Sequence, residues 1–223
     1  MKWILPILLP LLAAAGTTAI AQTSVAVSGY GAFSGTTTGN GIQQSPANQA
    51  GGIIELRHIA NPILGFEATY SFNRADQTYT TQGGACPAFG CSLSTESVRA
   101  NAHEITADWV PSLGIANFRP FGVLGVGLLL DVPSDSQATV VMTTPPCPSS
   151  GCATTTVTSP TSTSTKAVYV YGAGLDWGLL PHLGLRFQYR GNLYQAPNVS
   201  KLFSSTDTFT DTAEPMIGAY FNF

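Results

Sequence analysis

Eight segments of the chain alternate between apolar and polar residues with a period of two. That period is typical of a β-strand with one apolar and one polar face. The segments cover residues 24–33, 52–59, 63–73, 97–110, 118–130, 167–179, 184–194 and 215–223. Tilted strands of about ten residues are long enough to cross a membrane. The pattern predicts an all-β protein.

The connections between these segments alternate strictly in length. Short turns lie near residues 61, 113 and 181, and long loops cover residues 34–51, 74–96, 131–166 and 195–214. An outer-membrane barrel has short periplasmic turns and long external loops. With both chain ends on the periplasmic side, eight strands need three such turns and four such loops. The sequence therefore predicts an eight-stranded antiparallel up-and-down transmembrane β-barrel. Its threonine-rich stretch, residues 154–165, is expected to project into solvent as a mobile loop.

Composition narrows the class of protein further. Charged residues make up 9% of the chain, against about 25% in soluble proteins. After the first residues, no run of eighteen apolar residues occurs, which excludes membrane-spanning helices. The net charge is −3 and no run of basic residues points to nucleic acid or anionic lipid as a partner.

The N-terminal residues have the three parts of an export signal. Met1 and Lys2 give a positive start, residues 3–12 are apolar, and Ala19-Ile20-Ala21 fits the small-x-small rule for signal peptidase. The apolar part is short and contains two prolines, which argues against a membrane anchor. We expect residues 1–21 to be a cleaved signal peptide and residues 22–223 to form a single barrel domain.

Strand parity assigns each side chain to one face of the barrel. In the segment 184–194, Leu185, Phe187 and Tyr189 alternate with Arg186 and Arg190. The apolar set must face lipid, because a charged side chain there costs about 2–4 kcal/mol near the midplane. The same parity sends nine charged residues inward: Glu55, Arg57, Glu67, Glu104, Asp108, Arg119, Asp176, Arg186 and Arg190.

Three interpretations of these inward charges are open. An eight-stranded barrel is just wide enough for side chains to fill it, so the first is a plugged lumen in which opposite charges pair. The second is an ion pathway gated by switching those pairs. The third is a catalytic carboxylate cluster. We favour the plugged lumen, and expect glycines 125, 127, 172 and 174 to leave room for large inward side chains or sharp bends.

The four cysteines form two similar clusters, Cys86 with Cys91 and Cys147 with Cys152. An exported chain meets an oxidising compartment, which favours disulfides. We expect pairing within each cluster, because proline and glycine between the cysteines allow a tight ring; pairing between the two loops is the alternative. The spacing and the lack of a nearby histidine argue against zinc, and no other metal or cofactor is expected.

Several stretches resemble the outer membrane protein β-barrel domain, the family of small barrels of the OmpA/OmpX type. They are residues 120–127 (PFGVLGVG), 171–177 (YGAGLDW), 182–190 (HLGLRFQYR) and 217–223 (IGAYFNF). The resemblance implies an outer-membrane protein of Gram-negative type. It also implies that Phe223 is the C-terminal signal read by the barrel-assembly machinery. The sequence ends at Phe223, so we expect no peptidoglycan-binding domain; the two cysteine clusters depart from the commonest pattern of the family.

Some eight-stranded barrels are lipid-modifying enzymes that use a histidine and a serine at the lipid-facing surface. Only His103, on the outward parity, resembles such a base, and the sequence identifies no serine partner.

We therefore predict a non-enzymatic structural and surface-interaction role, with a small ion-conducting pore or a lipid-modifying enzyme as alternatives. The expected partners are outer-membrane lipid, the assembly machinery and an extracellular ligand bound by the loops. We expect a monomer.

Overall fold

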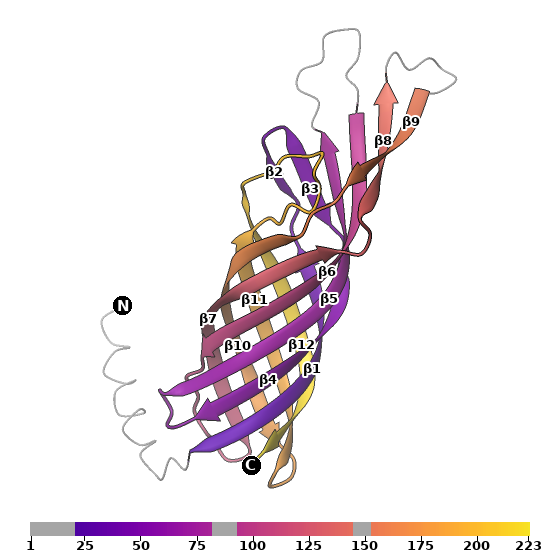
Figure 1. Cartoon of the computed structure of the whole chain (residues 1–223). Helices are drawn as coiled ribbons and strands as arrows, with labels where there is room; N and C mark the ends of the chain where they lie inside the picture. Colours follow the sequence, from indigo (N-terminus) through magenta and orange to yellow (C-terminus); the bar gives the residue numbers. More distant parts are fainter. Residues whose placement is uncertain (1–20, 82–92, 145–152) are drawn as a thin grey trace, which may run out of the picture.

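The computed structural model describes residues 21–81, 93–144 and 153–223, which form a single antiparallel sheet of twelve strands (Figure 1). The strands are β1 (Gln22–Ser34), β2 (Thr37–Gly39), β3 (Ile42–Pro46), β4 (Gln49–Ile59), β5 (Gly65–Thr81), β6 (Leu93–Trp109), β7 (Phe118–Pro133), β8 (Gln137–Thr144), β9 (Ala153–Pro160), β10 (Ser164–Gly178), β11 (Leu183–Gln195) and β12 (Phe209–Asn222). Within these residues no helix is long and apolar enough to cross a membrane.

Eight long strands close into a barrel, which confirms the predicted fold. They follow the order β5-β4-β1-β12-β11-β10-β7-β6, and pairing between β5 and β6 closes the ring. The first and last strands pair through Ser24 and Asn222, so both ends of the barrel sequence lie together. We call this end, which also holds the three short connections, the turn end, and the opposite end the loop end (Figure 1).

The register fixes the tilt of the strands. Stepping between directly paired residues around the ring leads from Thr23 through His58, Phe66, Trp109, Leu124, Tyr171, Gly191 and Ala213 back to β1 at Phe33. The path returns ten residues further along β1 than it started (33 − 23). For eight strands, a stagger of this size corresponds to a tilt of about 40° from the barrel axis.

The long connections contain more regular structure than predicted. β5 continues to Thr81 and β6 begins at Leu93, although residues 74–96 were expected to be a loop. β2 and β3 form a hairpin within the expected loop 34–51, and β8 and β9 form another within 131–166 (Figure 1). The threonine-rich stretch expected to be a mobile loop is thus largely strand β9, which keeps the expected solvent exposure.

A change of phase explains why β5 was predicted too short. Along the barrel the apolar side chains of β5 face outward, as Phe72 does, but beyond residue 73 they face inward, as Ala75 and Tyr79 do. The alternation continues while its apolar side switches faces. A search for one uninterrupted pattern therefore ends at the switch.

A small hydrophobic core closes the loop end of the barrel. It contains Ile42, Tyr79, Val98, Ala100, Ala138, Val199 and Phe203. Val199 and Phe203 belong to the segment 196–208, which crosses the loop end between β11 and β12 (Figure 1). The Tyr79 hydroxyl accepts a hydrogen bond from the Val199 amide at 3.0 Å and donates one to the Pro197 carbonyl at 3.2 Å. These contacts fix the segment 196–208 as a cap, the name used for it below.

Candidate functional site

The barrel interior holds a layer of paired charges at positions that strand parity assigns to it. Eight of the nine inward charges named from the sequence are buried: Glu55, Arg57, Glu67, Glu104, Asp108, Asp176, Arg186 and Arg190. The ninth, Arg119, is half-buried. The outward faces of the same strands expose large apolar side chains, among them Phe66, Ile105, Leu124, Val126, Tyr169, Phe187 and Ile217.

A first cluster of ion pairs lies nearer the turn end and is centred on Arg57 and Arg186. Nε of Arg57 donates to Glu67 at 2.6 Å, and its Nη1 donates to Asp176 at 3.2 Å. Nε of Arg186 donates to Asp176 at 2.7 Å, and its Nη1 lies 3.3 Å from Glu67 and 3.4 Å from Glu55. Two cations and three carboxylates from β4, β5, β10 and β11 are thus joined across the barrel.

Aromatic rings fill the space beside this first cluster. The guanidinium carbon of Arg57 lies 3.9 Å from the centroid of the Phe121 ring, and that of Arg186 lies 5.4 Å from it. Arg186 also lies 5.6 Å from the centroid of Tyr220. Gly174 makes room for Phe121, because a methyl group at that position would collide with the ring. The expectation that interior glycines accommodate large inward side chains is met at this position.

A second cluster lies nearer the loop end and is centred on Arg190. Its Nη2 donates to Glu104 at 2.8 Å and to Thr106 at 3.0 Å, and its Nη1 lies 3.5 Å from Asp108. Asn192 accepts a hydrogen bond from Nε of Arg190 at 3.1 Å and donates one to Glu104 at 3.0 Å. One cation therefore faces two carboxylates in this cluster.

Sequence reasoning missed three inward polar residues near the second cluster. Asp131, Asn192 and Glu214 are all buried. Asp131 and Glu214 lie one residue beyond the predicted ends of their strands, at 130 and 215. Extending the parity by one residue would have placed both carboxylates inside the barrel. Asn192 lies within a predicted strand on the inward parity, but only charged residues were selected there.

Two separate cavities flank the paired charges. One of about 450 Å³ opens at the turn end and is lined in part by Gln22, Arg119, Asp176 and Tyr220. The other, about 30 Å³, lies toward the loop end beside Glu104, Asp131 and Glu214. The two cavities share no lining residue, and both clusters of ion pairs lie between them. Arg119 donates to the side chain of Gln22 at the mouth of the larger cavity and makes no ion pair with a described residue.

The other residues singled out in the sequence lie apart from the barrel interior. His103 is on the outward face, and its Nδ1 lies 2.9 Å from the Tyr70 hydroxyl rather than beside a serine. The amide of Phe223 donates to the Thr23 carbonyl at 3.0 Å, across the seam between the last and first strands. The four cysteines and the expected signal peptide, apart from Ala21, lie outside the described residues. Among the residues with described positions, no group of three or more His, Cys, Asp and Glu side chains is arranged to hold a metal ion.

Comparison with solved structures finds similarity, at low sequence identity, to several outer-membrane and surface proteins. The attachment invasion locus protein Ail of Yersinia pestis, in complex with the heparin analogue sucrose octasulfate, is 15% identical over 91% of this chain and 99% of its own, with a TM-score of 0.40. Neisserial surface protein A is 14% identical over 91% and 99% of the chains, with a TM-score of 0.43. Outer membrane protein OprG of Pseudomonas aeruginosa is 10% identical over 91% and 96%, with a TM-score of 0.44. Comparison with curated proteins gives no match.

The family comparison covers nearly the whole sequence. Residues 7–214 match the model of the outer membrane protein beta-barrel domain. The matched region includes all of the barrel strands except residues 215–222 of β12. The chain therefore belongs to the outer membrane protein β-barrel domain family and is a Gram-negative-type outer-membrane protein of the OmpA/OmpX type.

Proposed function

We propose that this protein is a membrane-spanning scaffold with a closed lumen, which carries an interaction surface outside the cell at its loop end. The observation that supports this proposal most directly is the two clusters of buried ion pairs, one around Arg57 and Arg186 and the other around Arg190. Each of these arginines is fully buried and has a carboxylate within 2.8 Å. Removing one partner of such a pair costs about 3–5 kcal/mol, because the remaining charge is left buried without a partner. The paired side chains therefore occupy the lumen at these positions and support a closed interior.

The cap supports closure from the other side. Phe203 and Val199 of the cap belong to one hydrophobic core with side chains of β5 and β6. The Tyr79 ring of β5 stacks on Phe203, with ring centroids 6.0 Å apart. An ion entering from the loop end would meet this apolar core before it reached Arg190. The closed lumen leaves the outer surface and the loop end as the parts of the molecule that partners can reach.

The loop end offers a partner an unpaired strand edge. β9 pairs only with β8 among the described strands, and its residues are almost all exposed. An exposed edge strand can pair with an extended segment of another protein, which supplies main-chain hydrogen bonds. Its threonine-rich sequence provides polar contacts without charge. We propose that an extracellular ligand binds at this end. We also propose that the barrel is a monomer and that the barrel-assembly machinery inserts it into the membrane.

Conductance across a planar bilayer tests the closed lumen. Purified protein is expected to give no large, stable channels, whereas the Arg186→Ala variant, with a hole in the first cluster, should leak more. Stable channels in the unmodified protein would contradict the proposal and favour the small ion-conducting pore. Such a pore would select cations, because Glu104 and Asp108 contact the single cation Arg190, and Asp131 and Glu214 line the adjoining cavity together with Glu104.

The lipid-modifying enzyme is the less favoured alternative. Tyr70, not a serine, is the hydrogen-bonding partner of His103 among the described residues. A phenol at that place orients the imidazole ring but does not reproduce the serine nucleophile of the predicted pair. Incubation of the protein with phospholipid vesicles, followed by analysis of released or transferred acyl chains, should give no product. Acyl transfer that is lost in His103→Ala would establish the enzyme instead.

A further inference from the structure

The outward face of β5 and β6 carries a cluster of basic side chains at the loop end of the apolar band. Eight of the nine lysines and arginines lie in the described residues. Arg57, Arg186 and Arg190 are buried in the lumen, and Arg119 is at the turn end. Lys166 donates to Gln195, and Lys201 lies in the cap. Both remaining bases, Arg74 and Arg99, are exposed on neighbouring strands.

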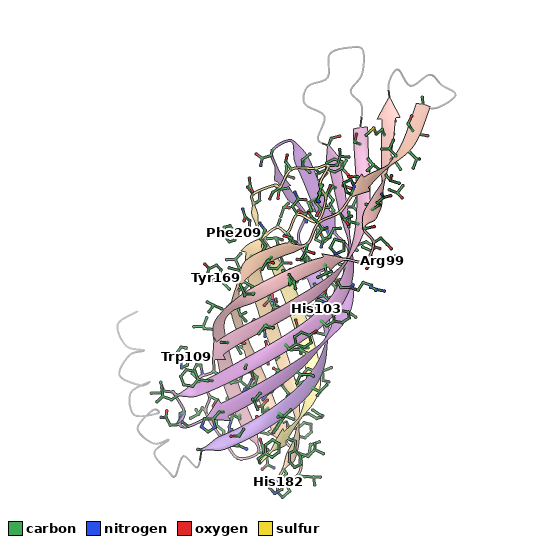
Figure 2. The ribbon with its side chains drawn as sticks, in the orientation of Figure 1. Arg99, His103, Trp109, Tyr169, His182 and Phe209 are labelled. Atoms are coloured by element: carbon green, nitrogen blue, oxygen red, sulfur yellow. The ribbon has the colours of Figure 1, made fainter. Side chains whose placement is uncertain are left out.

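The strand register brings Arg74, Arg99 and His103 together although no basic run joins them in sequence. Arg74 pairs directly with Asn101, which lies midway between Arg99 and His103 on β6. Arg74 is therefore the diagonal neighbour of both, at about 7–8 Å between backbone positions. Figure 2 shows Arg99 directed away from the ribbon, with His103 nearer the turn end on the same strand.

The height of this cluster matches the outer edge of the membrane. Arg74 lies ten residues beyond Leu64, an exposed residue at the turn end. At about 3.3 Å per residue and a tilt of about 40°, this separation is a rise of about 25 Å. An outer-membrane barrel has an apolar band of about 25 Å, so Arg74 lies where lipid headgroups begin. Below it the outward residues of β5 are apolar or aromatic: Phe66, Ala68, Tyr70 and Phe72.

The hydrogen bonds in the cluster leave its charge available. Nε of Arg74 donates to the neutral Asn101 side chain at 2.8 Å, and no carboxylate of the described residues lies within ion-pair distance of Arg74. Arg99 pairs with Asp76 at 2.9 Å, but both side chains are about half exposed, and such pairs exchange readily for other partners. Tyr70 holds Nδ1 of His103 at 2.9 Å, so Nε2 is the ring nitrogen left for a ligand.

We infer that Arg74, Arg99 and His103 bind the phosphate groups of a phosphorylated glycolipid in the outer leaflet of the membrane. Guanidinium groups donate two parallel hydrogen bonds to a phosphate, which suits Arg74 and Arg99 to this role. Phe72 and Tyr70 lie directly below and offer an apolar surface to the acyl chains of the same molecule. This lipid site is separate from the lumen and does not depend on whether the lumen conducts.

Native mass spectrometry of the purified protein in detergent tests the site, with diphosphorylated lipid A as the probe. The unmodified protein should retain lipid A and bind its dephosphorylated form much more weakly. The double variant Arg74→Gln, Arg99→Gln should lose at least about tenfold in affinity, since each arginine supplies charge-assisted hydrogen bonds. Asp76→Asn, which releases Arg99 from its ion pair, should bind more tightly. Lys201→Gln, which removes one positive charge from the cap, is the control for each single arginine replacement and should bind normally.

Three results would overturn the inference. The first is unchanged binding by the double variant once heat-modifiable mobility shows that its barrel has folded. The second is equal binding of the phosphorylated and dephosphorylated lipids. The third is full displacement of lipid A by inorganic phosphate at a similar concentration, which would assign the site to a free anion rather than to a glycolipid.

Discussion

Arg186 and Asp176 form a two-point ion pair between directly opposed residues of neighbouring strands. Nε of Arg186 donates to one carboxylate oxygen at 2.7 Å and Nη2 donates to the other at 3.0 Å. The two residues face each other in the β10–β11 register, so the pairing of the strands itself sets this geometry. Charged hydrogen bonds of this paired kind are among the strongest in proteins.

Replacing Arg186 with alanine should therefore destabilise the barrel by about 3–5 kcal/mol, because Asp176, Glu55 and Glu67 would keep their charges without this partner. Phe187→Ala is the matched comparison on the next residue of β11, which faces outward and is 39% exposed. Lipid can fill the space left by the phenyl ring, so its loss should cost less. Urea unfolding of both variants in bilayers measures the two free energies. A larger loss for Phe187→Ala would contradict our assignment of charges to the lumen.

The course of the barrel strands could be predicted because each strand obeys a single rule within the membrane. Lipid outside and a narrow interior force an apolar outward face, so the parity of Phe187 and Tyr189 locates Arg186 and Arg190 on the inner face. The rule ends at the membrane surface. Beyond it, inward residues such as Tyr79 become the apolar set, and the predicted end of β5 at residue 73 falls at this reversal.

Other features depended on information that parity does not carry. The β2–β3 hairpin had a local signal, because Asn40 and Gly41 both have positive φ, of 51° and 73°, as an Asn-Gly hairpin turn requires. That dipeptide was overlooked within an expected loop. The cluster of Arg74, Arg99 and His103 had no local signal, because its members meet only through strand pairing. Which carboxylate faces which arginine depends in the same way on the stagger of ten residues.

Deleting Phe223 should slow or abolish assembly of the barrel. Its amide donates to Thr23 at the seam between β12 and β1, and its ring packs edge-on against Phe221 with centroids 5.3 Å apart. Phe223→Tyr keeps the aromatic ring and the chain length, and should assemble normally. Outer-membrane yield and heat-modifiable mobility measure assembly. Normal values after the deletion would show that neither the signal nor the seam needs this residue.

Non-reducing peptide mapping should show Cys86 linked to Cys91 and Cys147 linked to Cys152. The prediction rests on the short spacing within each cluster and on the oxidising compartment that an exported protein meets. The two clusters lie in connections that follow β5 and β8. A peptide that joins Cys86 to Cys152 would show instead that these two connections are covalently tied together.

Glu96 should make the cap less stable as the pH rises. It lies on β6 beyond the membrane, opposite Tyr79 on β5 and Val140 on β8, and is fully buried. Neither of its carboxylate oxygens meets the geometry of a hydrogen bond to a described residue, although Ser159 and Ser200 lie close by. Burial raises the pKa of Glu96 above its ordinary value of 4.5, because the charged form loses its hydration, and this effect outweighs the opposite effect of the two serines.

Burial disfavours the ionised form of Glu96, so a rise in pH is what destabilises the cap. A carboxyl group whose pKa is raised in the folded protein is destabilising when ionised, above that raised pKa. The penalty disappears as the pH falls toward 4.5, where the folded protein holds the neutral form. Glu96→Gln should therefore stabilise the cap at pH 8 and have little effect near pH 4.5, since a buried amide costs less than a buried charge.

Amide hydrogen exchange of Val199 and Phe203 measures opening of the cap directly. At pH 8 these amides should exchange several-fold more slowly in Glu96→Gln than in the unmodified protein. The comparison is made at each pH between the two proteins, so that the intrinsic pH dependence of exchange cancels. Asp135→Asn, which removes one exposed negative charge from the same end of the molecule, is the matched control and should leave the rates unchanged. Equal protection in the Glu96→Gln and unmodified proteins at pH 8 would mean that the buried carboxylate does not weaken the cap.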